Sequence, residues 1–397
     1  MNPYAGERAT LLERLARAGA EAPRETPSPA GSRKELRYLA FYLPQFHPIP
    51  ENNAWWGDGF TEWTNATAGK PSFPGHHQPH LPSPELGLYD LRDPGVRELQ
   101  VQLARSHGID GFVYYHYWFG GRRLLERPFD EVLASGSPDF PFCLCWANEN
   151  WTRRWDGGDE STLMEQRYSD EDDLEHIRWL VTAFEDPRYV RVDGKPVLLV
   201  YRASQLPDAR LTTDTWRAEA ARLGVGELYL CRVEAFGQDR GDPTALGFDA
   251  GVEFQPDWWR RGRQLPYPAE LQDSTDRDPS ISGIFSYPVV AELALMHAAV
   301  PYKRYRCVMP GWDNSARRRG GATIYLGSTP ARYEQWLAGV IDQFQPYCAE
   351  ENLLFINAWN EWGEGNHLEP DTRWGGAYLE AHRRATRRAV PEQSKAG

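Results

Sequence analysis

Eight short runs of mostly apolar residues recur along the chain from Arg37 onward, and segments with helical spacing lie between most of them. Continuous apolar runs are typical of strands that are buried on both faces of a parallel sheet. Eight such strands alternating with helices predict a (β/α)8 barrel with long loops after its strands. An open doubly wound sheet is the alternative, but no Gly-rich phosphate loop follows the first run. The runs are residues 38–43, 111–117, 142–146, 197–201, 228–233, 250–254, 305–309 and 353–359.

The segments between these runs carry recognisable helix signals. Val96, Leu99 and Leu103 repeat at intervals of three and four residues, which predicts one buried helical face. Ser169 precedes another periodic segment and is a suitable N-cap, and Pro330 is suited to the first turn of a later helix. We therefore expect helices to cover the outside of the barrel.

The first 36 residues differ in character from the rest of the chain. Residues 11–15 suggest one short amphipathic helix, and the Pro-rich stretch at 23–29 reads as a linker. We predict an appendage at 1–36 and one catalytic barrel at 37–397. The start of the sequence is charged throughout and shows no secretory signal, so the prediction for the location is cytoplasmic.

Composition restricts the class of ligand. The net charge is −12 with no long basic run, which argues against nucleic-acid binding. No stretch is apolar enough to cross a membrane. The chain has 16 Trp and 19 Tyr, and flat aromatic faces suit a carbohydrate ligand, although core packing accounts for many of them equally well. The sequence makes no prediction of the oligomeric state.

Two carboxylates, Glu361 and Glu364, follow the eighth apolar run among tryptophans and glycines. In a helical or tight turn, side chains three residues apart have Cβ atoms about 5–6 Å apart. Retaining glycosidases need two carboxyl groups about 5–5.5 Å apart, whereas inverting enzymes need about 6.5–9.5 Å. The spacing therefore favours a retaining acid/base pair. The alternative is a structural pair between Glu361 and an Arg, with Glu364 simply exposed.

Polar and aromatic residues collect where the predicted strands end, as expected for the active face of a barrel. The segment Trp146-Ala147-Asn148-Glu149 resembles a clamp for sugar hydroxyl groups, and the long loop after the first strand is rich in aromatic and polar residues. The predicted substrate-binding residues are Gln45, His47, Glu62, Trp63, Tyr115, His116, Trp118, Trp146, Asn148, Glu149, Glu253, Trp312, Asp313, Asn360 and Trp362.

Metal and cofactor signals are weak, and we predict neither. His76, His77 and His80 form an H-H-x-x-H pattern, but Pro79 and Pro82 prevent a regular helical pair of ligands. Two D-x-D patterns, at 170–172 and 276–278, match a motif that holds a divalent ion in some sugar-nucleotide transferases. The first lies at a predicted helix N-terminus, where acidic residues are favoured in any case.

Five motifs in order resemble the WbsX-like family, which is related to glycoside hydrolase family 99, the endo-acting α-mannosidases and mannanases. They are YLPQFHP at 42–48, GFTEW at 59–63, YYHYW at 114–118, WANE at 146–149 and WNEWGEG at 359–365. The resemblance covers roughly residues 37–385 and implies a (β/α)8 barrel. It also implies that Glu361 and Glu364 are the catalytic pair and that no metal is required.

The resemblance implies a retaining mechanism that uses the sugar's 2-hydroxyl group. Glu361 would remove its proton while that oxygen attacks the anomeric carbon, and Glu364 would protonate the leaving oxygen. The leading hypothesis is therefore a hydrolase acting on a bacterial polysaccharide or oligosaccharide. A glycosyltransferase in O-antigen or surface polysaccharide biosynthesis is the alternative, and a non-catalytic glycan-binding barrel is the third.

Overall fold

Eight parallel strands form a closed barrel in the computed structural model, which describes residues 35–153, 161–266, 278, 280–297 and 299–387. Neighbouring strands pair in the order β1-β14-β12-β10-β9-β8-β4-β2, and β1 also pairs with β2. This last pairing closes the sheet, which confirms the (β/α)8 barrel and excludes the open doubly wound alternative. The barrel strands are β1 (Arg37–Tyr42), β2 (Gly111–Phe119), β4 (Phe142–Trp146), β8 (Lys195–Val200), β9 (Tyr229–Glu234), β10 (Ala250–Glu253), β12 (Arg304–Val308) and β14 (Leu353–Ile356).

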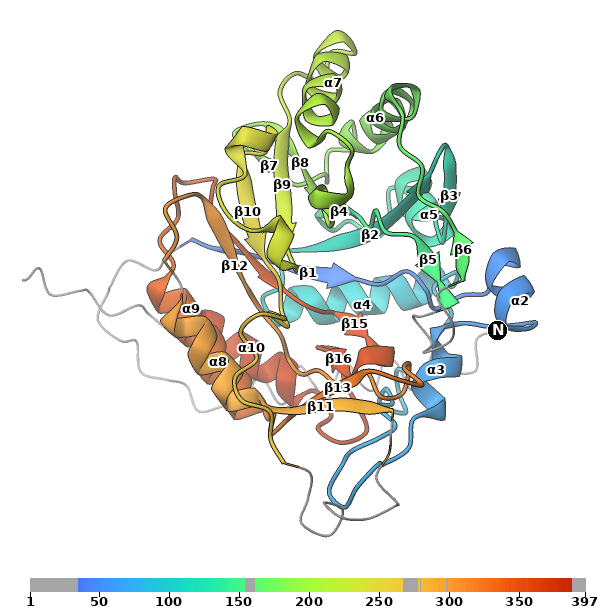
Figure 1. Cartoon of the computed structure of the whole chain (residues 1–397), viewed down its shortest axis with the longest axis vertical. Helices are drawn as coiled ribbons and strands as arrows, with labels where there is room; N and C mark the ends of the chain where they lie inside the picture. Colours follow the sequence, from blue (N-terminus) through green and yellow to red (C-terminus); the bar gives the residue numbers. More distant parts are fainter. Residues whose placement is uncertain (1–34, 154–160, 267–277, 279, 298, 388–397) are drawn as a thin grey trace, which may run out of the picture.

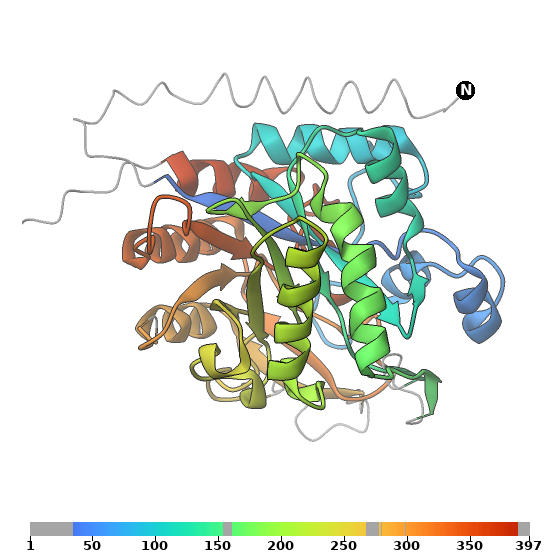
Figure 2. The ribbon, with the colours of Figure 1, turned by 90° about the horizontal axis from the view of Figure 1, so that it is seen from above.

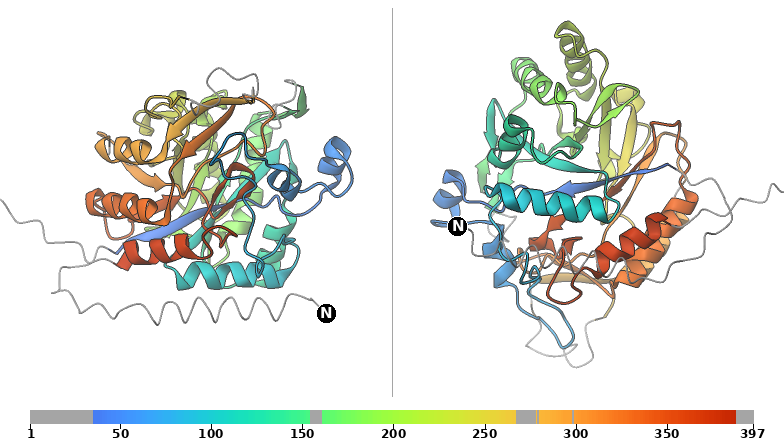
Figure 3. Two further views of the ribbon diagram at one scale, coloured as in Figure 1. Left: turned by 90° about the horizontal axis from the view of Figure 1, so that it is seen from below. Right: turned by 180° about the vertical axis from the view of Figure 1, so that it is seen from behind.

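Helices surround the strands (Figures 1 and 2). Figure 3 shows α9 and α10 side by side on one flank, where they make extensive contact, while α6 and α7 pack together elsewhere on the outside. The longer helices are α4 (Pro94–Ser106), α5 (Arg127–Ser135), α6 (Asp170–Phe184), α7 (Ala209–Arg222), α8 (Tyr287–Met296), α9 (Pro330–Gln343) and α10 (Ala377–Arg387).

The helix signals in the sequence are confirmed. Val96, Leu99 and Leu103 of α4 are buried against the barrel. The Ser169 side chain accepts a hydrogen bond from the backbone N–H of Asp172 and so caps α6. Pro330 occupies the first turn of α9, where its missing N–H costs nothing.

The strands explain why the core is continuous. Residues from all eight strands belong to one buried hydrophobic cluster, and most strands are buried along their whole length. Such burial on both faces is what the apolar runs predicted. The eighth strand ends at Ile356, three residues earlier than predicted, but the backbone N–H of Trp359 still donates to the Phe41 carbonyl of β1.

Shorter elements build the loops, most of them after the C-terminal ends of barrel strands, whereas β7 (Arg191–Val192) pairs antiparallel with the first residues of β8. The other short elements are α2 (Pro50–Trp56), α3 (Glu62–Ala68), β3 (Arg122–Leu124), β5 (Trp151–Thr152), β6 (Thr162–Met164), β11 (Ile281–Ser286), β13 (Ala322–Leu326), β15 (Asn360–Glu361) and β16 (Asn366–His367), with 3-10 turns η2 (Ala203–Gln205), η3 (Gly237–Asp239), η4 (Thr244–Leu246) and η6 (Trp362–Glu364). Most of the appendage predicted at 1–36 lies outside the described residues, as do residues 276 and 277 of the second D-x-D pattern. Among the described residues, no helix is both long and apolar enough to cross a membrane.

Candidate active site

A cavity of about 460 Å³ lies at the C-terminal ends of the strands, the end of the barrel where the sequence predicted a functional face. It is lined by residues from the loops after most of the barrel strands, together with α2, α3 and β5. Seven of the predicted site residues line it: Gln45, Glu62, Tyr115, Glu149, Trp312, Glu361 and Glu364.

The turn after β14 carries both predicted catalytic residues. Glu361 is in the two-residue strand β15, and the 3-10 turn η6 immediately follows and contains Glu364. Gly365 ends the turn with a positive φ of 58°, a left-handed conformation that glycine adopts without steric cost. The backbone N–H of Asp313 donates to the Glu364 carbonyl at 2.7 Å, which ties this turn to the neighbouring loop.

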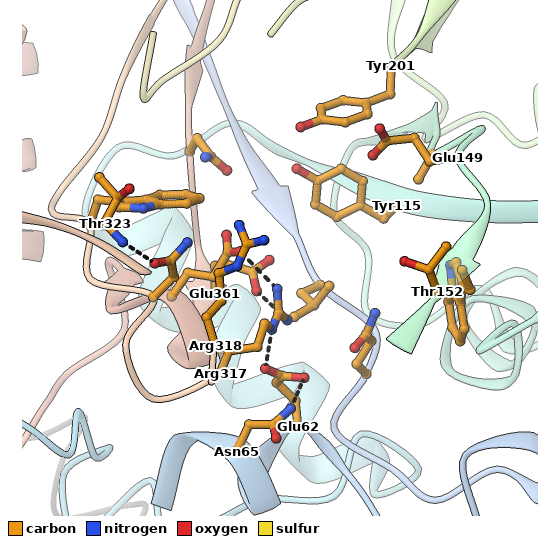
Figure 4. Close-up of a pocket in the computed structure, with 18 of the residues that line it drawn as sticks. Glu62, Asn65, Tyr115, Glu149, Thr152, Tyr201, Arg317, Arg318, Thr323 and Glu361 are labelled. Atoms are coloured by element: carbon orange, nitrogen blue, oxygen red, sulfur yellow. Dashed lines mark hydrogen bonds and ion pairs between the residues drawn. The ribbon is translucent and has the colours of Figure 1, made fainter. Parts of the chain in front are cut away.

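One arginine, Arg317, binds both carboxylates. Figure 4 shows it beside Glu361 and Glu62. Arg317 donates from its two terminal nitrogens to Glu361 at 2.9 Å and to Glu364 at 3.0 Å. Its Nε donates to Glu62 at 2.8 Å. Glu361 therefore does pair with an Arg, as the alternative interpretation supposed, but the same Arg also holds Glu364 and all three side chains line the cavity.

Glu62 reaches this cluster from a distant part of the chain. It is the first residue of α3, directly after the N-cap Thr61, where the helix dipole favours a negative charge. A Cβ atom at Gly363 would lie only 1.9 Å from a Glu62 carboxylate oxygen. The absence of a side chain at Gly363 is thus what allows Glu62 to lie directly against the turn after β14.

The electrostatics of the cluster favour retention of a proton. Burial raises the pKa of Glu361 well above its usual value, and the charges of Glu364 and Glu62 raise it further against the opposing effect of Arg317. Burial, together with Glu62, also raises the pKa of Glu364. Burial alone would lower the pKa of Arg317, but the three carboxylates raise it well above its ordinary value. Three carboxylates thus surround one permanently charged guanidinium, a situation that favours one protonated carboxyl group.

Glu149 lies on another side of the cavity, with Tyr115 and Tyr201 nearby (Figure 4). It forms an ion pair with Arg202. Burial raises the pKa of Glu149, while the charge of Arg202 opposes this rise. The predicted hydroxyl clamp is therefore placed at the cavity by its glutamate rather than by its asparagine.

Aromatic side chains form much of the remaining wall. Trp258 packs edge-on against Trp312, and Trp151 packs edge-on against Tyr117. Flat apolar faces next to carboxylates suit a ligand that has both C–H faces and hydroxyl groups. The aromatic residues that line the cavity are Trp56, Phe60, Tyr115, Tyr117, Trp151, Tyr201, Phe236, Phe254, Trp258 and Trp312.

The other ten predicted substrate-binding residues lie outside the lining of this cavity. Strand alternation explains two of them: Tyr115 and Tyr117 of β2 point into the cavity, so His116 and Trp118 point outward. His116 stacks on Trp179 of α6, and Trp118 donates to Asp172 at 2.7 Å. Trp146 faces the same helix layer and packs against His176 and Trp216.

Several of the remaining residues hold the backbone or neighbouring side chains. Asn148 donates to the Arg202 carbonyl, and Trp63 donates to the Tyr89 carbonyl. Trp362 donates to Glu369 at 2.8 Å, and Glu253 pairs with Arg306 at 2.8 Å. His47 is buried, and burial lowers its pKa to about 4, so its imidazole is neutral at pH 7.

The histidine-rich loop is likewise engaged in packing. His76 contacts Asp313 at 2.6 Å, and His80 faces His367 across 3.4 Å. Burial lowers the pKa of both His80 and His367 to about 3. The carboxylate of Asp313, which was predicted to bind substrate, is therefore paired with His76. These side chains line a separate cavity of about 230 Å³, which the turn after β14 borders at Gly365.

Asn360 connects the end of the first strand to the turn after β14. Its side chain accepts from the backbone N–H of Leu43 at 2.7 Å and donates to the Leu43 carbonyl at 3.0 Å, and it is fully buried. We expect Asn360→Ala to lower the free energy of unfolding by about 1–3 kcal/mol for each backbone group left unpaired. Urea denaturation measures this change, and a loss within the error of the wild-type value would contradict the structural role.

Arg317 is the main site residue that sequence analysis missed. It lies in a short basic run at 317–319, which looks like an ordinary solvated charge cluster. Its partners are 44, 47 and 255 residues away along the chain, so no local pattern connects them. Tyr117, in contrast, shares the strand face of Tyr115 and follows from alternation alone.

Comparison with known proteins identifies the family. The model of the family described as "Glycosyltransferase WbsX" matches residues 38–382. The chain belongs to the WbsX family. Two curated WbsX relatives, both called "Uncharacterized protein WxcX", come from Xanthomonas campestris pv. campestris strains B100 and ATCC 33913. Each is 45% identical over 353 residues, which is 88% of this chain and 50% of the relative. This WbsX chain thus spans about half the length of the curated relatives it matches.

Solved structures share the fold of this WbsX chain. The GH99 endo-α-mannosidase from Bacteroides thetaiotaomicron aligns with a TM-score of 0.53 and 14% identity, covering 88% of this chain and 96% of that one. A structure described as a glycoside hydrolase-like protein aligns with a TM-score of 0.56 and 14% identity, covering 91% and 97%. The family match and the GH99 likeness agree with the resemblance seen in the sequence motifs.

Proposed function

We propose that this protein is a retaining glycoside hydrolase that cleaves a bacterial polysaccharide or oligosaccharide. The observation that carries the proposal is the pair Glu361 and Glu364, both hydrogen-bonded to Arg317 at the wall of an aromatic-lined cavity. Both carboxyl groups bind the same guanidinium, which supports the short separation that a retaining pair needs. The fold that the chain shares with a GH99 endo-α-mannosidase supports the same class of reaction.

The proposed first step uses Glu361 as a base and Glu364 as an acid. Glu361 takes the proton of the sugar's 2-hydroxyl group, that oxygen bonds to the anomeric carbon, and the bond to the leaving oxygen breaks as Glu364 protonates it. The positive charge of Arg317 favours the ionised form of Glu361 that acts as the base, while burial raises its pKa and so strengthens that base toward a hydroxyl group. The raised pKa of Glu364 helps it to hold the proton that it must donate.

The second step reverses these roles. Glu364, now ionised, takes a proton from water, whose oxygen attacks the anomeric carbon from the face that the leaving group occupied. The first step leaves a 1,2-anhydro sugar, in which the 2-oxygen is bonded to the anomeric carbon. That bond now breaks, and the 2-oxygen regains its proton from Glu361. Two inversions at one carbon give net retention.

The configuration of the first product tests this mechanism. We expect proton NMR of a reaction on a cleaved glycan to show the anomer of the substrate first, before mutarotation. The substrate would come from a panel of bacterial polysaccharides. A first product of inverted configuration would require an additional water between the carboxylates and would contradict the proposed pair.

Glycosyl transfer in surface polysaccharide assembly is the second candidate, because the family description names this activity. A transferase consumes a sugar-nucleotide donor, whereas a hydrolase needs only glycan and water. Incubation of the protein with glycan alone, and with glycan plus a set of sugar nucleotides, separates the two. Turnover only in the presence of a sugar nucleotide would replace hydrolysis by transfer.

A further inference from the structure

Arg317 is placed to influence the charge of Glu361 and Glu364, although it takes no part in the bonds that the proposed reaction makes and breaks. All three of its guanidinium nitrogens are bonded to carboxylates, and its side chain is only 10% exposed. The two terminal nitrogens serve Glu361 and Glu364, whereas Nε serves Glu62. The orientation of the guanidinium plane is therefore fixed by a residue that lies outside the catalytic turn.

Glu62 is well suited to hold this plane. Its side chain is 2% exposed, and its helix α3 packs directly against η6. Its carboxylate occupies the place where a Cβ atom at Gly363 would lie, 1.9 Å from the nearer oxygen. A buried carboxylate at this point also adds a third negative charge next to two others, which disfavours simultaneous ionisation of the three.

We propose that Arg317, oriented by Glu62, is a positioning residue that sets the protonation states of Glu361 and Glu364. The positive charge of Arg317 allows Glu361 to act as a base, while the negative charge of Glu62 prevents Glu364 from losing its proton too easily. The proposal rests on the proposed hydrolase function only for its activity readout, because the charge cluster exists in the free protein.

Other groups face the cluster and must be considered. Arg318 contributes positive charge near Glu364. Tyr115 and Tyr117 of β2 and Tyr201 after β8 line the same cavity, and burial raises the pKa of all three, so they remain uncharged at neutral pH. The tyrosines therefore add no charge to the cluster. Arg317 is hydrogen-bonded directly to Glu361 and Glu364, and Glu62 is hydrogen-bonded to Arg317.

Opposite shifts of the pH profile are the expected signature. In Arg317→Met, the loss of positive charge should move both limbs of the kcat/KM profile to higher pH, by about 1–3 units. In Glu62→Gln, the loss of negative charge should move both limbs to lower pH. Arg317→Lys keeps the charge but not the fork, so it should lower kcat and leave the profile near that of the wild type.

Arg123→Met is the matched control. Arg123 has a similarly buried side chain, 13% exposed, and pairs with Asp130 outside the cavity. Its loss should affect stability and leave the pH profile in place. If Arg317→Met and Glu62→Gln only lower kcat, with profiles that superimpose on the wild type, the proposal is wrong.

A second readout does not depend on activity. A carboxyl group whose pKa is raised by folding binds more protons in the folded state, so stability falls as pH rises from the unfolded pKa, about 4.3, through the folded pKa. Between about pH 5 and pH 8, the Tm of Arg317→Met should therefore fall more steeply than that of the wild type, and the Tm of Glu62→Gln less steeply. Adding Glu361→Gln to Arg317→Met should remove most of the extra slope.

The two readouts separate the two ideas. If these slopes appear but the wild type cleaves no glycan, the charge assignment holds and the hydrolase proposal fails. If glycan is cleaved but neither slopes nor profiles respond, Arg317 and Glu62 have only a structural role and the present inference fails.

Discussion

Glu364→Gln is expected to lower kcat/KM on unactivated glycans by about 10²–10⁴, the usual contribution of a general acid. Glutamine keeps the shape of the side chain but has no proton to give to a leaving oxygen. On aryl glycosides with a strongly activated leaving group the loss should be small, because such a group departs without protonation. The measurement is the ratio of the two kcat/KM losses.

Glu369→Gln is the control for this experiment. Glu369 is buried beneath the same turn and accepts hydrogen bonds from the indole nitrogens of Trp359 and Trp362, and burial raises its pKa to about 7. Because it lies outside the cavity, its substitution should lower activity on both kinds of substrate by the same factor. The same equal loss in Glu364→Gln would remove Glu364 from the role of acid.

The barrel itself was predictable because a strand that is buried on both faces has apolar residues at successive positions. A run such as the one at 197–201 can be recognised in the sequence without knowing which strands pair with it. The closing pair β1 and β2 follows from the count of strand–helix units rather than from any single residue. The C-terminal end of the barrel, where the cavity lies, could therefore be predicted as the functional face before any side chain was placed.

The individual side chains of that face were less predictable. His116 and Trp118 share a motif with Tyr115, but alternation along β2 sends them to the helix layer instead of the cavity. The side-chain amides of Asn148 and Asn360 could bind sugar hydroxyl groups. In the structure they bind backbone groups at neighbouring strand ends. Residue type alone does not distinguish these two uses.

Arg317 shows why the charge network was not predictable. The sequence places Glu361 and Glu364 together, because only three residues separate them. The guanidinium between them comes from the loop after β12, and the third carboxylate comes from a helix after β1. Only closure of the barrel brings the first and the last strands, with their loops, to one point.

Glu361→Gln is expected to lower the turnover of activated and unactivated substrates alike. A good leaving group removes the need for an acid, but it does not supply a base for the 2-hydroxyl group. The expected loss in kcat/KM is at least as large as that of Glu364→Gln on poor leaving groups, about 10²–10⁴. Side-by-side kinetics of the two variants on the same aryl glycoside provide the comparison.

The 2-hydroxyl group gives this prediction a chemical test. The wild-type protein should not cleave a substrate that lacks this group, because the attacking oxygen is then absent. A synthetic 1,2-anhydro sugar should be opened by the wild-type protein, because it stands for the intermediate, and more slowly by Glu361→Gln, because Glu361 returns the proton to the 2-oxygen in the second step. If Glu361 instead attacked the anomeric carbon itself, a substrate with fluorine at position 2 would leave a covalent sugar on it, and the mass of the intact protein would rise accordingly. Such an adduct would assign Glu361 as a nucleophile and exclude participation of the 2-hydroxyl group.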